Sequence, residues 1–110
     1  MEPVEINNGQ WYLRGLRCDD RVDDRPALTE MGEDDLDYVH DAADGWADDT
    51  RYTWAVCEPT TGEMLAEIAL DPVSGHMSSR ARPGFEDVAA ISEDTVRRYA
   101  SAALGLEVHT

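Results

Sequence analysis

The sequence contains no lysine and only two cysteines, and no apolar run in it is long enough to cross a bilayer. Cys18 and Cys57 are too few for a disulfide framework and match no metal motif, so we expect two free thiols in a reducing compartment. The first residues, MEPVEINNGQ, lack the basic and apolar regions of a secretory signal peptide. These absences argue against a membrane protein or a secreted disulfide-rich domain, and they predict a cytoplasmic location.

Acidic residues dominate the charge, since 24 Asp and Glu against nine arginines give a net charge of −15. Arginine without lysine, with Asp more frequent than Glu, is typical of a GC-rich, actinobacterial-type gene or of a salt-adapted protein, and composition does not separate the two. So acidic a surface repels nucleic-acid backbones and anionic membranes, which we exclude as partners. Region 19–49 holds 11 Asp and 2 Glu against two arginines. We expect it to form an acidic face suited to a basic protein.

Length and hydrophobic periodicity predict one domain, residues 1–110, of the mixed α+β class. Apolar spacing of three and four predicts helices at about 33–47 and 86–104, with a helical turn beginning at Pro26 and a stop at Gly105. Runs rich in aromatic, β-branched and aliphatic residues predict the strands, which are residues 10–17, 52–57, 64–70, 76–81 and 106–109.

The spacing within each predicted helix also indicates which side chains face the core. Asp34, Asp35 and Asp37 are expected in the first helical turn, where negative charge suits the helix dipole. Trp54, on a predicted strand, is expected in the core. The helical residues expected to face the core are Leu36, Val39, Ala43 and Trp46, followed by Val88, Ile91, Thr95, Tyr99 and Ala103.

Three segments, taken in order, resemble the GNAT superfamily of N-acetyltransferases. WYLRGLRCDD, residues 11–20, resembles its first strand, which ends in Leu-Arg before an acidic loop. WAVCEPTTGEMLAEIAL, residues 54–70, is similar to its second and third strands with a TGE-type turn between them. VRRYASAALGLEV, residues 96–108, resembles the helix and fifth strand that follow the cofactor loop. The resemblance implies a GNAT-like, mostly antiparallel sheet covered by helices and truncated after the fifth strand.

The resemblance also implies acetyl-CoA or another acyl-CoA as donor and an amine as acceptor. In the family, backbone N–H groups of an Arg/Gln-x-x-Gly-x-Gly/Ala loop hold the pyrophosphate at a helix N-terminus. The matching loop makes Arg80, Arg82, Gly84 and Phe85 the candidate cofactor-binding residues, with both arginines as phosphate partners. The alternative is that the arginines pair with the protein's own carboxylates.

The loop departs from the family pattern in ways that weaken a cofactor site. Aligned on its first arginine, it has Pro83 in place of the first glycine and Phe85 in place of a small residue. Proline has no N–H to donate, and Glu86 and Asp87 add negative charge where the phosphate would lie. The sequence also ends at Thr110, before the helix and hairpin that complete the acceptor site in typical members.

Glu67, in the strand at 64–70, is the candidate general base that would deprotonate the acceptor amine. The alternative is a solvated carboxylate on the outer face of an alternating strand. The segment Asp41–Gly45 misses the spacing of a calcium loop, and the three histidines indicate no ligand site, so no metal is expected.

Two functions remain open, and the sequence leaves undecided whether the protein is an enzyme. The first is a domain related to acyl-CoA-dependent N-acyltransferases, weak or inactive alone. The second is a non-catalytic, acidic protein-interaction module, a subunit or regulator with the same fold, forming a homodimer or hetero-complex through a sheet edge. An open groove between the fourth and fifth strands, faced by the amides of residues 85–87, would favour the enzyme, and a filled groove would favour the module.

Overall fold

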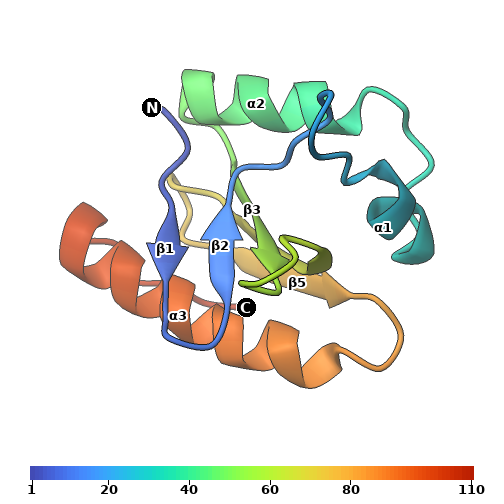
Figure 1. Cartoon of the computed structure of the whole chain (residues 1–110). Helices are drawn as coiled ribbons and strands as arrows, with labels where there is room; N and C mark the ends of the chain where they lie inside the picture. The colour runs from blue at the N-terminus through green and yellow to red at the C-terminus, as the bar shows by residue number, and fades with distance from the viewer.

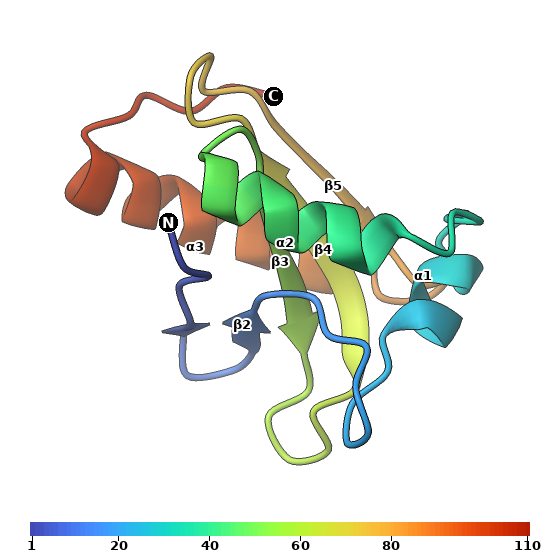
Figure 2. The ribbon, with the colours of Figure 1, turned by 90° about the horizontal axis from the view of Figure 1, so that it is seen from above.

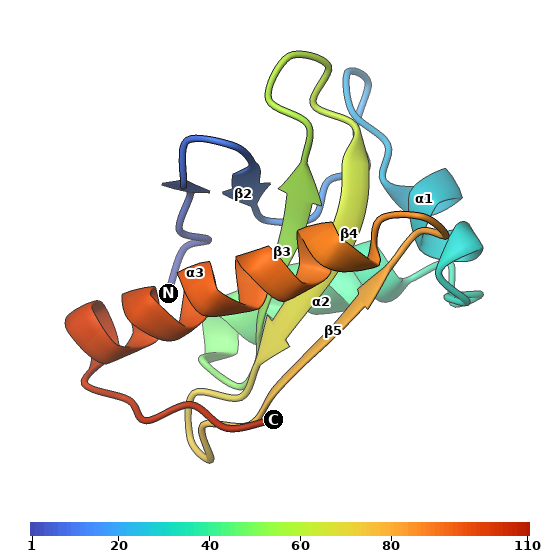
Figure 3. The ribbon, with the colours of Figure 1, turned by 90° about the horizontal axis from the view of Figure 1, so that it is seen from below.

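A five-stranded antiparallel sheet lies at the centre of the computed structural model, which describes residues 1–110. Helices α1 (Arg25–Glu30) and α2 (Tyr38–Asp48) lie on one face, and α3 (Glu86–Leu104) covers the other (Figure 1, Figure 2 and Figure 3). This arrangement confirms the predicted mixed α+β class and the mostly antiparallel sheet. In chain order and in spatial order, the strands are β1 (Ile6–Asn7), β2 (Tyr12–Arg14), β3 (Tyr52–Cys57), β4 (Met64–Leu70) and β5 (Met77–Ala81).

The hairpin of β3 and β4 forms the middle of the sheet, and every residue of both strands is buried. Trp54 pairs with Ile68 on the face that α3 covers, and the Trp54 ring meets Tyr99 edge to face at 6.0 Å. Ala55 pairs with Glu67 on the opposite face, beneath α1 and α2. Because helices cover both faces, these strands are almost continuously apolar, which is the signal that made them predictable.

Helix α3 has the predicted bounds, and Gly105 ends it with a left-handed φ of 61°. The predicted core face is wrong at Ile91, which is 41% exposed, and at Ala103. Close packing on the sheet favours small side chains. Hydrophobic spacing alone does not predict that such small residues are buried. The side chains that α3 buries are Val88, Ala89, Ser92, Thr95, Val96 and Ala100.

No helix of the structure has both the length and the apolar character needed to cross a membrane.

Helix α2 begins at Tyr38, five residues later than predicted, and the acidic residues expected in its first turn precede it. The Glu33 carboxylate accepts from the N–H of Asp35, and the Asp35 carboxylate accepts from the N–H of Asp37. Such short side-chain turns compete with helical hydrogen bonds, which explains the late start. Leu36, expected in the core, therefore lies in this turn and is 83% exposed.

Trp46 is the largest buried residue of α2, in the core as predicted, and it joins the helix to β3. Its indole N–H donates to the Thr53 carbonyl at 2.9 Å, and its ring stacks on Tyr52 at 4.4 Å. Its edge contact with Trp54 has ring centroids 4.9 Å apart. Ala43, by contrast, is exposed, so its predicted core position is wrong. Gly45 approaches the next segment so closely that a Cβ there would lie 2.7 Å from the Arg51 carbonyl oxygen.

The ends of the chain differ most from the predicted elements. The first predicted strand is shorter, since β2 covers only Tyr12–Arg14, and the short β1 beside it was not predicted. The predicted last strand, 106–109, is reduced to a parallel bridge between His76 and His109. The bridge consists of two backbone hydrogen bonds, from Met77 N to His109 O at 2.8 Å and from His109 N to Gly75 O at 2.9 Å.

Salt is expected to stabilise the fold, because α2 and the residue before it carry a row of exposed like charges. Asp37, Asp41, Asp44 and Asp48 follow one another at spacings of four, three and four residues. Like charges at these spacings destabilise isolated helices by about 0.2–0.5 kcal/mol per pair, and salt screens the repulsion. The urea midpoint should therefore rise when NaCl is raised from about 0.05 to 1 M, across which the Debye length shrinks severalfold. In the matched double variant Asp41→Asn/Asp48→Asn, the rise should be smaller; an equal rise would contradict this explanation.

Candidate functional site

The candidate site is a group of five polar residues on the face of the sheet beneath α1 and α2, which we name the Glu67 cluster. Glu67 lies at the middle of β4, between Ala55 of β3 and Arg80 of β5, and it is 3% exposed. The alternative that Glu67 is solvated is therefore wrong, because the segment before α2 covers this face. The members of the Glu67 cluster are Glu67, Tyr38, Arg80, Glu33 and Arg51.

Both carboxylate oxygens of Glu67 accept short hydrogen bonds within the cluster. The Tyr38 hydroxyl donates to Oε2 at 2.7 Å, and Arg80 Nε donates to Oε1 at 2.7 Å. Arg80 Nη2 also donates to Glu33 Oε1 at 2.9 Å, so one guanidinium bridges two carboxylates. The cluster therefore engages both oxygens of Glu67, one through an arginine and one through a phenol.

Tyr38 lies between two arginines. The guanidinium carbon of Arg80 is 5.1 Å from the ring centroid and that of Arg51 is 5.6 Å, while Arg51 Nη1 donates to the Tyr38 hydroxyl at 3.0 Å. Burial, and then the charge of Glu67, raises the pKa of Tyr38. Burial alone would lower the pKa of Arg80, but the Glu67 charge and the hydrogen bonds to both glutamates outweigh it and raise the pKa. At neutral pH the phenol is therefore neutral and the arginine charged.

Arg82, the second candidate phosphate partner, is directed towards the β3–β4 turn and α1. Its Nη1 donates to a carboxylate oxygen of Glu63 and its Nε lies 2.9 Å from Glu30 Oε2. Its guanidinium carbon is also 5.9 Å from the Phe85 ring centroid. Arg80 and Arg82 thus make the carboxylate pairs given above as the alternative, and their role in holding phosphate remains a prediction.

The loop that precedes α3 contains the other two candidate residues, Gly84 and Phe85. The Phe85 N–H donates to the Arg82 carbonyl at 3.0 Å, and Gly84 takes a left-handed φ of 92°. The Gly84 N–H points to Glu86 Oε1 at 3.4 Å, a weak contact that directs it towards negative charge. The five main surface hollows are lined by other parts of the chain and include none of residues 83–87.

The outer edge of β5 is unpaired beyond its first residue. His76 and Arg82 bond inward to β4, whereas the Met77 N–H bonds outward to His109. Because bonding directions alternate along a strand, the main-chain groups of Ser79 and Ala81 point outward, and no strand lies beyond β5. The groove that would favour an enzyme is expected between this strand and residues 106–109, and the edge of β5 is the part of that region with free backbone donors and acceptors.

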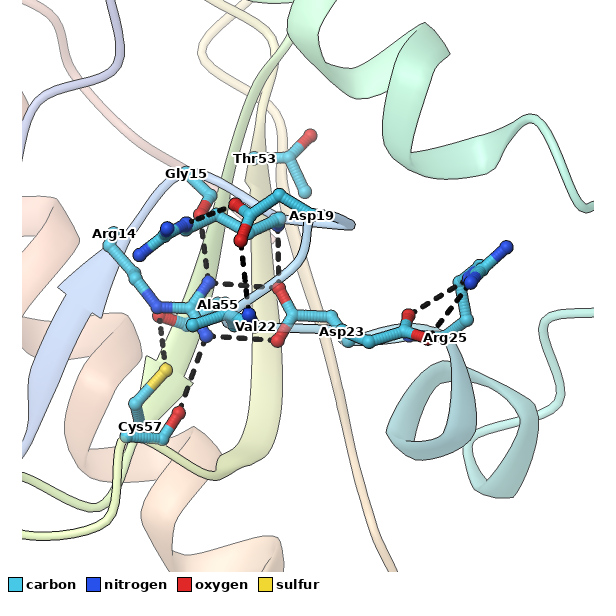
Figure 4. A network of polar contacts seen from close by, with 12 residues as sticks. Arg14, Gly15, Asp19, Val22, Asp23, Arg25, Thr53, Ala55 and Cys57 are labelled. Carbon is cyan, nitrogen blue, oxygen red and sulfur yellow. Dashed lines mark hydrogen bonds and ion pairs between the residues drawn. The ribbon is translucent and has the colours of Figure 1, made fainter.

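A buried ion pair of Arg14 and Asp24, which sequence reasoning did not identify, lies on the same side of the sheet. Arg14 Nη1 and Nη2 donate to the two carboxylate oxygens of Asp24 at 2.8 and 2.9 Å, and Asp24 also accepts from the Arg17 N–H at 2.7 Å (Figure 4). The two side chains are 5% and 2% exposed. Arg14 further donates to the Gly62 carbonyl in the β3–β4 turn at 3.3 Å. The pair therefore joins β2, the segment before α1 and the central hairpin.

Comparison with known proteins supports the fold. No family model and no curated protein matches the sequence. Among solved structures, the chain is similar to a protein of Vibrio cholerae assigned as a ribosomal-protein-serine acetyltransferase, with a TM-score of 0.70, over 96% of this chain and 72% of that chain. The sequence identity is 13%, so the similarity is one of fold alone. The chain therefore shares the fold of that protein, which agrees with the GNAT-like fold that its sequence predicts.

Proposed function

We propose that this protein is a GNAT-like domain without independent acyltransferase activity, which acts by binding a basic protein. One observation carries the proposal: the side chains that would perform the chemistry are already paired with one another. Glu67 has a donor on each oxygen, and Arg80 and Arg82 each contact two carboxylates. A general base or a phosphate-binding group must face its substrate, and here each of these groups is already engaged by side chains of the protein itself.

The charge around the N-terminus of α3 also argues against tight binding of a cofactor phosphate. Glu86 and Asp87 occupy its first turn, where a bound pyrophosphate would need donors and positive charge. Pro83 removes one backbone donor from the loop, and Phe85 N already bonds to Arg82. The nearest cation, Arg82, is neutralised by Glu30 and Glu63.

Charge supplies the argument for the partner. The net charge of −15 and the Asp-rich region 19–49 would attract a basic protein and speed their encounter, with a rate that falls as salt rises. The exposed aspartates of α2 lie on the outer side of that helix, away from the sheet, and are therefore accessible to a partner.

Calorimetric titration with acetyl-CoA tests this proposal. We expect no saturable heat up to millimolar ligand, which corresponds to binding weaker than about −4 kcal/mol. The matched variant Pro83→Gly/Phe85→Ala/Glu86→Gln/Asp87→Asn restores the small residues and removes the two charges. It should bind more tightly than the parent protein if the loop is what prevents binding. Saturable binding by the parent at micromolar concentrations, together with release of CoA in the presence of an amine, would contradict the proposal.

A weak acyl-CoA-dependent transferase is the second candidate, and the free edge of β5 favours it. The outward main-chain groups of Ser79 and Ala81 would pair with an extended chain that carries amides, such as the pantetheine arm of an acyl-CoA. In that case the titration would show weak heat that the loop variant strengthens, and dephospho-CoA or pantetheine alone would compete.

A further inference from the structure

His76 and His109 lie side by side although they are far apart in the sequence. They are partners in the parallel bridge between the start of β5 and the last segment, so their backbones are fixed next to each other. Their ring centroids are 5.6 Å apart, with a tilt of 54° between the ring planes, and both side chains are exposed. The fold thus assembles a pair of imidazoles that neither segment has alone.

One ring of the pair is held in a defined tautomer. His109 Nε2 lies 3.2 Å from the Ser74 carbonyl oxygen. A carbonyl only accepts hydrogen bonds, so Nε2 carries the proton and the neutral ring has its lone pair on Nδ1. Histidines that bind metals usually donate their second ring N–H to a carbonyl or carboxylate in this way, which fixes the ring and leaves the other nitrogen free.

We propose that His76 and His109 bind a divalent transition metal ion of the zinc, copper and nickel class. An ion about 2.0–2.1 Å from one nitrogen of each ring would place the ring centroids up to about 6 Å apart, which is compatible with the observed separation of 5.6 Å. These ions prefer imidazole nitrogen as a ligand, whereas calcium and magnesium prefer carboxylate oxygens such as those elsewhere on the surface. The strongly negative protein would raise the local concentration of any cation.

The consequence for the fold is a cross-link at the one place where the last segment pairs with the sheet. Two backbone hydrogen bonds join this segment to β5, from Met77 N to His109 O and from His109 N to Gly75 O, and buried Val108 accepts a further bond from Arg97. A metal ion bound by both rings stabilises the closed arrangement of the segment by mass action, because only that arrangement brings the two rings together. The ion would therefore hold the last segment more firmly against β5.

Thermal unfolding with zinc chloride tests the site. Zinc at about ten times its dissociation constant should raise the midpoint of the parent protein by about 5 °C. His76→Ala and His109→Ala should each abolish this shift. The control variant His40→Ala should retain the shift. His40 is the best surface alternative for zinc, because its Nε2 lies 3.6 Å from Asp44 Oδ2. Copper should bind more tightly than zinc, and calcium at the same concentration should not reproduce the dependence on the histidines.

Amide hydrogen exchange gives a second measurement that does not depend on the variants folding normally. In the parent protein, zinc should slow exchange at the N–H groups of Met77 and His109, which make the bridge, relative to that of Val56 in the central hairpin. A zinc shift that persists in both histidine variants, or slower exchange spread evenly over the chain, would overturn the proposal. So would the absence of any zinc effect on the parent.

Discussion

Replacing Asp24 with alanine is expected to lower the free energy of unfolding by about 3–5 kcal/mol, the range for removing one partner of a buried ion pair. The variant leaves the Arg14 guanidinium, which is 5% exposed, without its bidentate partner, and the Arg17 N–H without its acceptor. Because the free energy of unfolding of a small domain is only about 5–15 kcal/mol, this one change should remove a large part of it.

Urea denaturation of the parent, Asp24→Ala and Asp20→Ala proteins would measure this effect. Asp20 lies in the same acidic segment and is exposed, so its replacement controls for the loss of one negative charge. We expect the Asp20 variant to remain close to the parent. The double variant Arg14→Met/Asp24→Ala should recover part of the loss, since it also removes the unpaired charge. A loss for Asp24→Ala below about 1 kcal/mol would show that the pair contributes little.

Replacing Glu67 with alanine is the second large expected effect, a loss of about 2–4 kcal/mol from leaving buried or half-buried donors unpaired. The Tyr38 hydroxyl would lose its acceptor and Arg80 one of its two carboxylates. Glu67→Gln keeps the shape and an acceptor oxygen, so it should cost less. The effect follows from a structural role of Glu67, whether or not any acyl-CoA binds.

The matched control for Glu67 is Glu63→Ala, which removes a glutamate of the neighbouring turn that pairs with Arg82 and is 55% exposed. An exposed pair of this kind contributes little to stability, so its denaturation midpoint should move much less. If Glu67→Ala were as stable as Glu63→Ala, the cluster would not be the structural unit that its hydrogen bonds indicate. Catalysis by Glu67 would then regain support, because the residue would be free of a structural task.

The elements that could be predicted from the sequence are those whose signals are local. The hairpin of β3 and β4 and helix α3 have their predicted bounds because apolar runs, a Gly-containing turn and a terminal glycine lie within a short stretch of chain. The start of α2 could not be predicted in this way. Its hydrophobic spacing extends back to Leu36, but the carboxylates of Glu33 and Asp35 bond to the backbone instead.

The candidate site could be predicted only in part, because its partners come from distant segments. Glu67 and Arg80 are functional candidates from the sequence, yet β4, which is apolar except for Glu67, does not reveal that Tyr38 and Glu33 cover that face. The abundance of acidic residues does indicate the pairing of Arg80 with carboxylates, as one of two alternatives. The juxtaposition of His76 and His109 had no local signal at all, since it exists only through the parallel bridge.

The order of the sheet has a consequence for how the protein folds. Its five strands lie side by side in the order in which they occur along the chain, so most pairings join segments that are close in sequence. Low sequence separation between contacting residues favours rapid folding, because little chain entropy is lost before each contact forms. The exception is the pairing of β2 with β3, which closes a loop that contains α1 and α2. We expect β3, β4, β5 and α3 to form the folding nucleus, and the N-terminal strands to dock on it late.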